Sequence, residues 1–380
     1  MFAVHKWAGL VTGALFFLTA ASGFVLLFAE DANLRAQPRV RVGPVYAHLG
    51  PTLAEVAAAH PGYALSFVRL SPEPDLAWAA LLRHPQTDDR IVADLDPYTG
   101  KVIAYRDYDS TAFRILFDLH YTYFAGPAGK VASTAVSLAL IVLSITGLWI
   151  YRGAIRDVFR WRARRASSGR AALTWLHKWT GLWALGLALV WGVTGFVFML
   201  SILPAAFGPS KRRFVPADPS SLRALPDTAA LFARAREALP GGEIGTFFPG
   251  ASGGSVGAPR VRVFFRQNWP WEKFGEVRFA PSGEIASVVR PESAPAGVKF
   301  NTAIVALHFG FMGHRATHVV YALGGLIMIF LPASGCAMWW LKHRRAVWAL
   351  PALVTPADAA APVGTLPDTD TVLAATCDKH

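Results

Sequence analysis

Four long apolar runs constrain the fold of this chain more than any other feature of its sequence. They extend from Trp7 to Phe28, Val131 to Ile150, Trp179 to Leu203 and Val319 to Leu341. Each holds about 20 residues or more, which is long enough to cross a ~30 Å hydrocarbon core at ~1.5 Å per helical residue. Only 16% of the residues are charged, whereas soluble domains average about 25%. The sequence therefore predicts four transmembrane helices, the first too long for a signal-peptide core.

The basic residues predict how these helices are oriented. Lys and Arg number 37 against 25 Asp and Glu, a net charge of +12. They gather in the short loop between the second and third runs and directly after the fourth, at Lys342–Arg345. Short basic loops remain in the cytoplasm. We therefore expect both termini to be cytoplasmic and the long polar segments 30–118 and 204–300 to face the other side. Because the positive charge flanks apolar runs, it does not indicate nucleic-acid binding.

A six-residue motif occurs twice near the start of an apolar run. His5-Lys-Trp-Ala-Gly-Leu recurs as His177-Lys-Trp-Thr-Gly-Leu. Each copy is followed, 18 residues after its histidine, by a glycine, Gly23 or Gly195. The first and third runs therefore resemble each other over their whole length.

A second motif links the even-numbered runs. Leu-His ending at His120 recurs as Leu-His ending at His308, and a glycine follows each histidine after 27 residues, at Gly147 and Gly335. Two gap-free correspondences predict a tandem duplication of a unit made of span, outer segment and span. Because each unit has two spans, the copies run parallel and are related by a pseudo-two-fold axis along the membrane normal.

We therefore expect a membrane α-helical fold, with four transmembrane helices in two parallel tandem repeats and two small extracytoplasmic α+β domains. The predicted parts are residues 1–29 (first helix), 30–118 (first outer domain), 119–151 (second helix with its lead-in), 152–173 (basic loop), 174–203 (third helix), 204–300 (second outer domain), 301–342 (fourth helix with its lead-in) and 343–380 (cytoplasmic tail without fixed structure). Alternating polar and apolar residues predict four strands in the first outer domain. In the second they predict three, Arg260–Phe265, Glu276–Ala280 and Ile285–Val289.

The repeated histidines are the strongest candidates for a functional site, since polar side chains beside membrane spans are costly and tend to be functional. Two-fold symmetry puts His5 and His177 at one depth and His120 and His308 at another. Two imidazoles on facing helices are the axial ligands that a six-coordinate haem iron needs. Two such pairs predict two haems. The chain has two cysteines and no Cys-x-x-Cys-His, so the haems would be non-covalent, of b type.

Two alternatives remain for these histidines. A single histidine at a membrane interface often serves as an interfacial anchor. His314 and His318 are four residues apart and have no counterpart in the first repeat, so either one could replace His308 as the axial ligand, bind a metal, or form an interfacial polar patch.

Several of these motifs together resemble a known family, the PepSY-associated transmembrane family. They are His-Lys-Trp-x-Gly-Leu opening a span, Leu-His before the next, Asp96-Pro-Tyr-Thr-Gly-Lys-Val102 in the outer segment, and Trp-Leu-Lys-x-Arg-Arg at the end of the last span. The resemblance covers nearly the whole chain. It implies PepSY-like periplasmic domains, a location in the bacterial inner membrane, and haem-dependent reduction of ferric siderophores.

A di-haem protein of this kind would move electrons outward to a periplasmic ferric siderophore or other ferric chelate. The sequence has no dinucleotide or flavin fingerprint, so the electrons would come from a quinol or a cytoplasmic flavoprotein. Trp269, Trp271, Tyr121, Tyr123 and Phe124 are candidates for the acceptor's docking site or for an aromatic belt. The competing hypotheses are a non-redox PepSY membrane protein that binds or regulates a periplasmic partner, and a transporter, although the spans carry almost no charges to couple ions.

Overall fold

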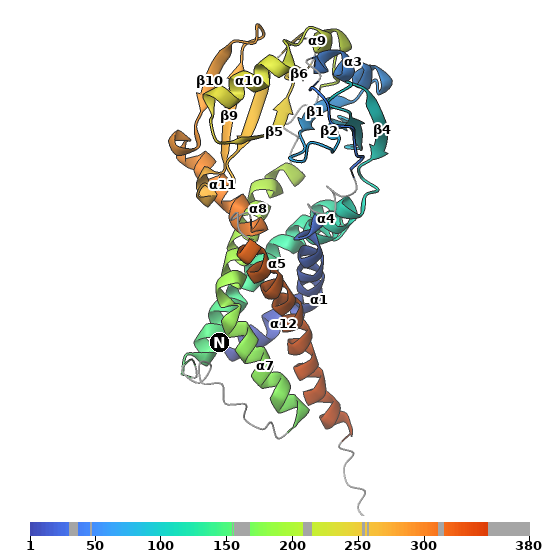
Figure 1. Cartoon of the computed structure of the whole chain (residues 1–380). Coiled ribbons are helices and arrows are strands. Elements are labelled where there is room, and N and C mark those ends of the chain that lie inside the picture. Colours follow the sequence, from blue (N-terminus) through green and yellow to red (C-terminus); the bar gives the residue numbers. More distant parts are fainter. Residues whose placement is uncertain are drawn as a thin grey trace, which may run out of the picture. The chain divides into compact units, whose positions relative to one another are not determined.

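Four helices of the protein are long and apolar enough to cross a membrane. The computed structural model describes residues 1–29, 37–45, 48–153, 155, 168–207, 215–252, 255–256, 258–310 and 315–348. The four helices are α1 (Phe2–Leu26), α5 (Gly126–Tyr151), α8 (Leu185–Phe207) and α12 (Arg315–Trp348) (Figure 1). They lie in the four predicted spans, although α8 begins later than the third predicted span and α12 continues past the predicted end of the fourth at residue 342.

The polarity of these helices is reversed relative to a soluble bundle. Large apolar side chains point outward, with Val11 79% and Leu323 58% exposed. The hydroxyl residues Ser22, Ser133 and Thr194 are buried instead. In lipid, hydroxyls between helices satisfy one another or the backbone, whereas apolar side chains face the acyl chains. This pattern agrees with a bilayer around the helices.

Three further helices lie next to the spans. α4 (Ala112–Thr122) and α11 (Ala296–Phe309) come before α5 and α12, so the predicted domain boundaries at 118/119 and 300/301 fall inside helices. α7 (Gly169–Trp183) precedes α8, and the third span is therefore not one helix from Trp179, as the apolar run suggested. Ala184 between them keeps a right-handed helical backbone and donates to the Thr180 carbonyl at 2.9 Å, so the interruption is a bend.

The two outer segments form one antiparallel sheet. Its eight strands follow the order β10-β9-β8-β5-β1-β2-β3-β4 (Figure 1). Their bounds are β1 Ala64–Arg69, β2 Trp78–Arg83, β3 Arg90–Leu95, β4 Val102–Asp107, β5 Glu243–Phe248, β8 Arg260–Phe264, β9 Phe274–Phe279 and β10 Ile285–Val289. A separate two-stranded hairpin, β6 (Ala251–Ser252) and β7 (Ser255–Val256), follows β5.

In the structure the two expected outer α+β segments share this one sheet. The halves join where β1 pairs with β5, in the register Val68↔Phe247 and Arg69↔Thr246. The sequence patterns did not predict β5. Gly245 lies inside that strand and glycines also precede it, and glycine in a strand interior weakens the strand signal. β5, the strand that joins the two halves, is therefore a strand that β-propensity does not predict.

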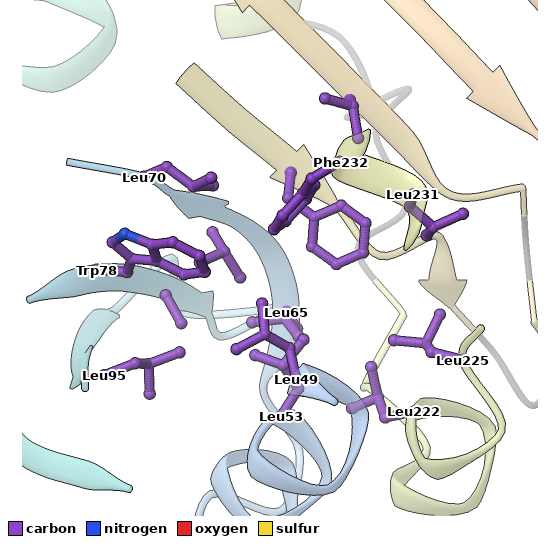
Figure 2. Close-up of a cluster of buried hydrophobic side chains, with 14 of the residues drawn as sticks. Leu49, Leu53, Leu65, Leu70, Trp78, Leu95, Leu222, Leu225, Leu231 and Phe232 are labelled. Carbon is purple, nitrogen blue, oxygen red and sulfur yellow. The ribbon is translucent and has the colours of Figure 1, made fainter. Parts of the chain in front are cut away.

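The core of the sheet domain draws on both halves of the chain. Helices α3 (Leu49–Ala59), α9 (Pro219–Arg223) and α10 (Thr228–Ala238) contribute to one buried cluster with the strands (Figure 2). Trp78 and Phe232, one from each half, meet edge to face at 5.9 Å. Each large buried side chain stabilises the fold by about 1.5–3 kcal/mol. The halves therefore fold as one unit.

Short helices and one buried ion pair complete the sheet domain. Two 3-10 turns, η1 (Pro270–Glu272) and η2 (Pro291–Ser293), lie before β9 and α11. Asp94 on β3 is fully buried, and Arg106 on β4 binds both of its carboxylate oxygens at 2.5 and 2.7 Å. A bidentate ion pair of this kind compensates the buried charge of Asp94, which would otherwise destabilise the sheet.

Candidate functional site

The structure brings the four repeated histidines together in two pairs. His5 on α1 and His177 on α7 have ring centroids 6.5 Å apart and ring planes at 89°. His120 on α4 and His308 on α11 have centroids 6.2 Å apart and planes at 68°. These are the two pairings that the repeat predicts. We call them the N-terminal pair (His5 and His177) and the sheet-side pair (His120 and His308).

The two pairs lie near opposite ends of α1. His5 is in its first turn, and the ring of His120 rests against Gly23 near its last turn. At about 1.5 Å per residue, the 18 residues between these positions correspond to about 27 Å along the helix. A hydrocarbon core is ~30 Å thick. The pairs are therefore separated by about the thickness of a bilayer core.

In the N-terminal pair a hydroxyl group holds each imidazole. The Nδ1 of His5 lies 3.0 Å from the Thr146 hydroxyl, and the Nδ1 of His177 lies 2.7 Å from the Ser334 hydroxyl. Each hydroxyl donates its only hydrogen to a carbonyl earlier in its own helix, at 2.7 and 2.9 Å. Each oxygen therefore accepts, and Nδ1–H of both histidines is the donor.

The sheet-side pair is held in a related way. The Nδ1 of His308 lies 2.8 Å from the Thr194 hydroxyl, which itself donates to a carbonyl in α8 at 2.6 Å. His120 differs, since its Nδ1 donates to the Thr19 carbonyl at 2.9 Å, while the Ser22 hydroxyl is more distant at 3.4 Å. A carbonyl only accepts, so the proton again lies on Nδ1.

All four imidazoles therefore carry their proton on Nδ1 and keep a lone pair on Nε2. A neutral histidine whose other nitrogen is fixed by a hydrogen bond is the usual form of a metal ligand in proteins. Burial lowers the pKa of His120 and of His308, and His120 lowers that of His308 further, which favours the neutral rings. Each pair therefore offers two nitrogen lone pairs, on rings whose centroids are 6.5 or 6.2 Å apart, and such lone pairs can bind a metal.

A glycine faces each of the four rings. A Cβ placed on these glycines would approach the Cε1 atom of the facing histidine to 2.7 Å for Gly23 and His120, 3.3 Å for Gly147 and His5, 3.7 Å for Gly195 and His308, and 3.8 Å for Gly335 and His177. The closest of these approaches is shorter than any real contact of a Cβ atom. These are the repeated glycines of the sequence motif, so their spacing from the histidines has a structural reason, which is room for a ring on the neighbouring helix.

The sequence patterns did not single out the hydroxyl residues that lie beside the histidine rings. Each lies directly before one of the four glycines, so a Ser-Gly or Thr-Gly dipeptide faces every histidine of the two pairs. The dipeptides begin at Ser22, Thr146, Thr194 and Ser334. This repetition was visible in the sequence, but hydroxyl residues are common in membrane helices and only the contacts distinguish these four.

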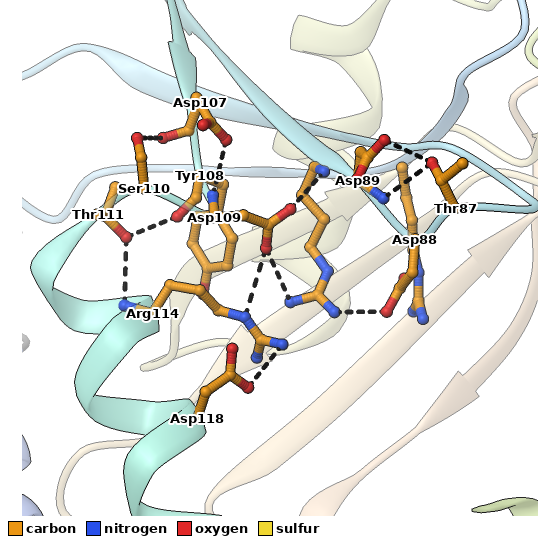
Figure 3. Close-up of polar contacts among 12 residues, drawn as sticks. Thr87, Asp88, Asp89, Asp107, Tyr108, Asp109, Ser110, Thr111, Arg114 and Asp118 are labelled. Carbon is orange, nitrogen blue, oxygen red and sulfur yellow. Dashed lines mark hydrogen bonds and ion pairs between the residues drawn. The ribbon is translucent and has the colours of Figure 1, made fainter. Parts of the chain in front are cut away.

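An ion-pair network fixes the helix that carries His120 (Figure 3). Arg114 on α4 contacts Asp109 at 3.4 Å and Asp118 at 2.8 Å. Asp109 in turn contacts Arg90 of β3 at 3.7 Å and accepts from its backbone N–H at 2.8 Å. Thr111 caps the helix by accepting from the Arg114 N–H. Because Arg114 is only 12% exposed, water screens these pairs less than at the surface, and α4 is held to the sheet.

The helix that carries His308 is fixed by hydrogen bonds to its last turn. The Trp191 indole donates to the His308 carbonyl at 3.1 Å, and the Tyr321 hydroxyl donates to the Leu307 carbonyl at 2.6 Å. These carbonyls lie at the C-terminus of α11, where no helical partner exists. Side chains of α8 and α12 therefore hold both the end of α11 and the ring of His308.

The structure describes one of the two alternative ligands, His318. The His318 side chain on α12 is exposed, and the structure pairs His308 with His120. His314 lies outside the described residues. Among the residues that the structure describes, no group of three or more His, Cys, Asp or Glu side chains is placed to hold a metal ion. Each histidine pair would therefore supply two ligands and no more.

An apolar cavity of ≈ 370 Å³ lies between α1 and α12. On α12 its lining residues flank the Ser334-Gly335 dipeptide that contacts His177. The lining consists of Gly13, Ala14, Phe17, Leu18, Pro332, Ala333 and Cys336. The cavity is apolar and open, and on α12 its lining is adjacent in sequence to the dipeptide that contacts His177.

The aromatic residues predicted for a dock or a belt divide into two groups. Trp269 and Trp271 stack in parallel at 5.5 Å and are 67% and 43% exposed, and Phe124 is 62% exposed. Tyr121 and Tyr123 are partly buried instead, and the Tyr123 hydroxyl contacts that of Thr19 at 2.6 Å. Only the first group presents free aromatic surface.

Comparison with known proteins gives one family and one partial relative. The family described as PepSY-associated TM region matches residues 2–342. An uncharacterized protein of Pseudomonas aeruginosa, PA4219, is 34% identical over 92 residues, which are 24% of this chain and 23% of that protein. The match therefore spans less than a quarter of the relative's length, and the relative's name assigns no activity.

The glycines facing the histidines can be tested with a matched pair of substitutions. Gly23→Ala places a Cβ at 2.7 Å from the His120 ring, and overpacking of this kind costs about 1–3 kcal/mol. Gly186→Ala, in the corresponding helix α8, meets nothing within 4 Å, and alanine favours a helix by up to ~1 kcal/mol. Thermal unfolding of the purified protein should show a lower midpoint for Gly23→Ala and an unchanged or higher one for Gly186→Ala. Equal midpoints would contradict the close packing of Gly23 and His120.

Proposed function

Because this chain belongs to the PepSY-associated transmembrane family, we propose that it is a di-haem b reductase of the bacterial inner membrane. In this proposal His5 and His177 hold one haem, and His120 and His308 hold the other. The protein passes electrons outward to a ferric siderophore or another ferric chelate in the periplasm. The alternative is a non-redox membrane protein that binds or regulates a periplasmic partner.

The distance between the two imidazole rings within each histidine pair is the observation that carries the proposal. Two imidazoles that bind one metal from opposite sides, with nitrogens at about 2 Å, have ring centroids about 6 Å apart. The centroids of the two pairs are 6.5 and 6.2 Å apart. Packing of neutral histidines does not require this separation, or a lone pair on every Nε2.

The residues at each pair fit a haem better than a bare metal ion. Two imidazoles satisfy only two positions of a six-coordinate metal, and a macrocycle supplies the other four. Among the described residues no third His, Cys, Asp or Glu side chain joins either pair in a metal-binding group. When bound, a haem iron supplies one-electron transfer. The chain contributes the ligands, apolar helix faces that exclude water, and glycines that admit flat groups between helices.

The two-fold arrangement belongs to the proposal as well. Corresponding residues of the sequence repeat make corresponding contacts, as Thr146 does with His5 and Ser334 with His177. We attribute this to a tandem duplication with two parallel copies. The sheet and the sheet-side pair then lie on the periplasmic side, the N-terminal pair and both termini on the cytoplasmic side, as the basic loops indicate.

The electron donor and the acceptor follow from chemistry. A quinol in the bilayer or a cytoplasmic flavoprotein supplies electrons at the N-terminal pair. At the sheet side a ferric chelate accepts one. Fe(III) is a hard ion that oxygen ligands hold tightly, whereas Fe(II) is softer and is held less well, so reduction releases the iron.

The haem content of the purified protein tests the binding part of the proposal. A pyridine haemochrome assay should give two b-type haems per chain, and His177→Ala should give one, because His5 then has no opposite ligand. His84→Ala, which alters a histidine of the sheet domain, serves as the control and should keep both haems. A colourless protein from cells supplied with haem would favour the non-redox alternative.

Proteoliposomes with a reductant trapped inside and a ferric chelate outside test the direction of transfer. His308→Ala should keep one reducible haem but lose reduction of the external chelate, because most of the ~30 Å core then separates the remaining haem from the acceptor. His318→Ala should reduce the chelate at the normal rate, since this side chain is exposed. Normal reduction of the external chelate by His308→Ala, together with its loss in His318→Ala, would show that His318 is the ligand.

A further inference from the structure

The hydroxyl groups that precede the four glycines differ in one respect that has a functional consequence. Three of them are close partners of Nδ1, at 3.0 Å for Thr146, 2.7 Å for Ser334 and 2.8 Å for Thr194. The fourth, Ser22, lies 3.4 Å from His120, whose Nδ1 has a closer partner in the Thr19 carbonyl at 2.9 Å. The hydroxyl of the dipeptide is therefore the closest partner of Nδ1 at three positions and not at Ser22.

We propose that Thr146, Ser334 and Thr194 are positioning residues that fix the tautomer and ring orientation of His5, His177 and His308, and that Ser22 has no such role. The inference rests on the proposed function, because it concerns how these imidazoles ligate haem iron. Each of the three hydroxyls is made an acceptor by donating its own hydrogen to a helix carbonyl, at 2.6 to 2.9 Å. It can then bind only the Nδ1–H form, which leaves Nε2 as the ligand.

The three hydroxyls are not equivalent. The carbonyl of Leu143 also reaches the His5 ring, and the carbonyl of Leu331 reaches that of His177. Within the described part of the chain, the Nδ1 of His308 has Thr194 as its one hydrogen-bond partner. Losing the hydroxyl therefore leaves His5 and His177 a nearby backbone carbonyl, whereas among the described residues the Nδ1 of His308 loses its one acceptor. The expected order of effects is Thr194 first, Thr146 and Ser334 next, and Ser22 last.

Two consequences follow for a bound haem. Hydrogen-bonded partners of a ligating histidine typically change metal affinity by about 10- to 100-fold when they are removed. A hydrogen bond from Nδ1–H also makes Nε2 a stronger base, which stabilises Fe(III) relative to Fe(II). Loss of the bond should therefore raise the midpoint potential of that haem, by about 59 mV for each tenfold change in the ratio of the two affinities.

The test uses purified full-length protein loaded with haem, with the rate of haem loss and the two midpoint potentials as readouts. Thr194→Val keeps the shape of the side chain but removes the hydroxyl, and should accelerate loss of one haem by tenfold or more and raise its potential. Thr194→Ser restores the hydroxyl and should return both values to those of the unaltered protein. Ser22→Ala is the matched control and should change neither.

The outcomes separate this inference from the proposed function. An unaltered protein that binds no haem would overturn the proposed function. Two haems in the unaltered protein, with potentials unchanged in Thr194→Val, would overturn the positioning role and leave the proposed function standing. An equal shift in Ser22→Ala and Thr194→Val, or failure of Thr194→Ser to restore the potential, would also overturn it, because the effect would then come from packing and not from the hydrogen bond.

Discussion

The hydrogen bond from each imidazole Nδ1–H to an oxygen on a neighbouring helix is the interaction on which the rest of the membrane region depends. In lipid an unpaired polar group costs several kcal/mol, so a histidine among apolar helices needs a partner on each nitrogen. Four histidines find one partner for Nδ1 within the protein, three of them in hydroxyls of Thr146, Thr194 and Ser334. The Nδ1–H tautomer leaves a lone pair on each Nε2, and in the proposed function a metal centre accepts it.

The two edge strands of the sheet lead into the helices that carry His120 and His308. β4 and β10 are the outermost strands of the sheet, and the chain passes from β4 to α4 and from β10, through η2, to α11. These two helices carry His120 and His308. A single core joins the strands between the edges, so the distance between the two helix origins is set by a packed sheet. Joining the halves through β1 and β5 therefore stabilises the sheet-side pair as well as the sheet.

Features that follow from one segment or from repetition could be predicted from the sequence, whereas features that depend on contacts between distant segments could not. Span lengths predicted four membrane helices, although not the bend between α7 and α8, and the 18- and 27-residue spacings predicted which histidines lie together. The strand β5 was missed because Gly245 weakens its local pattern, and with it the joining of the two halves. The roles of Thr146, Thr194 and Ser334 were missed because a hydroxyl becomes a histidine partner only through a contact between distant helices, which no local pattern records.

A density map of the purified full-length protein, by cryo-electron microscopy or crystallography, tests the central claim most directly. We expect flat, haem-sized density between His5 and His177 and again between His120 and His308. Each Nε2 should point into that density, and each Nδ1 should lie on the hydroxyl or carbonyl oxygen described above. Rings in direct contact with no density between them, or Nε2 atoms bound to protein or water, would contradict it.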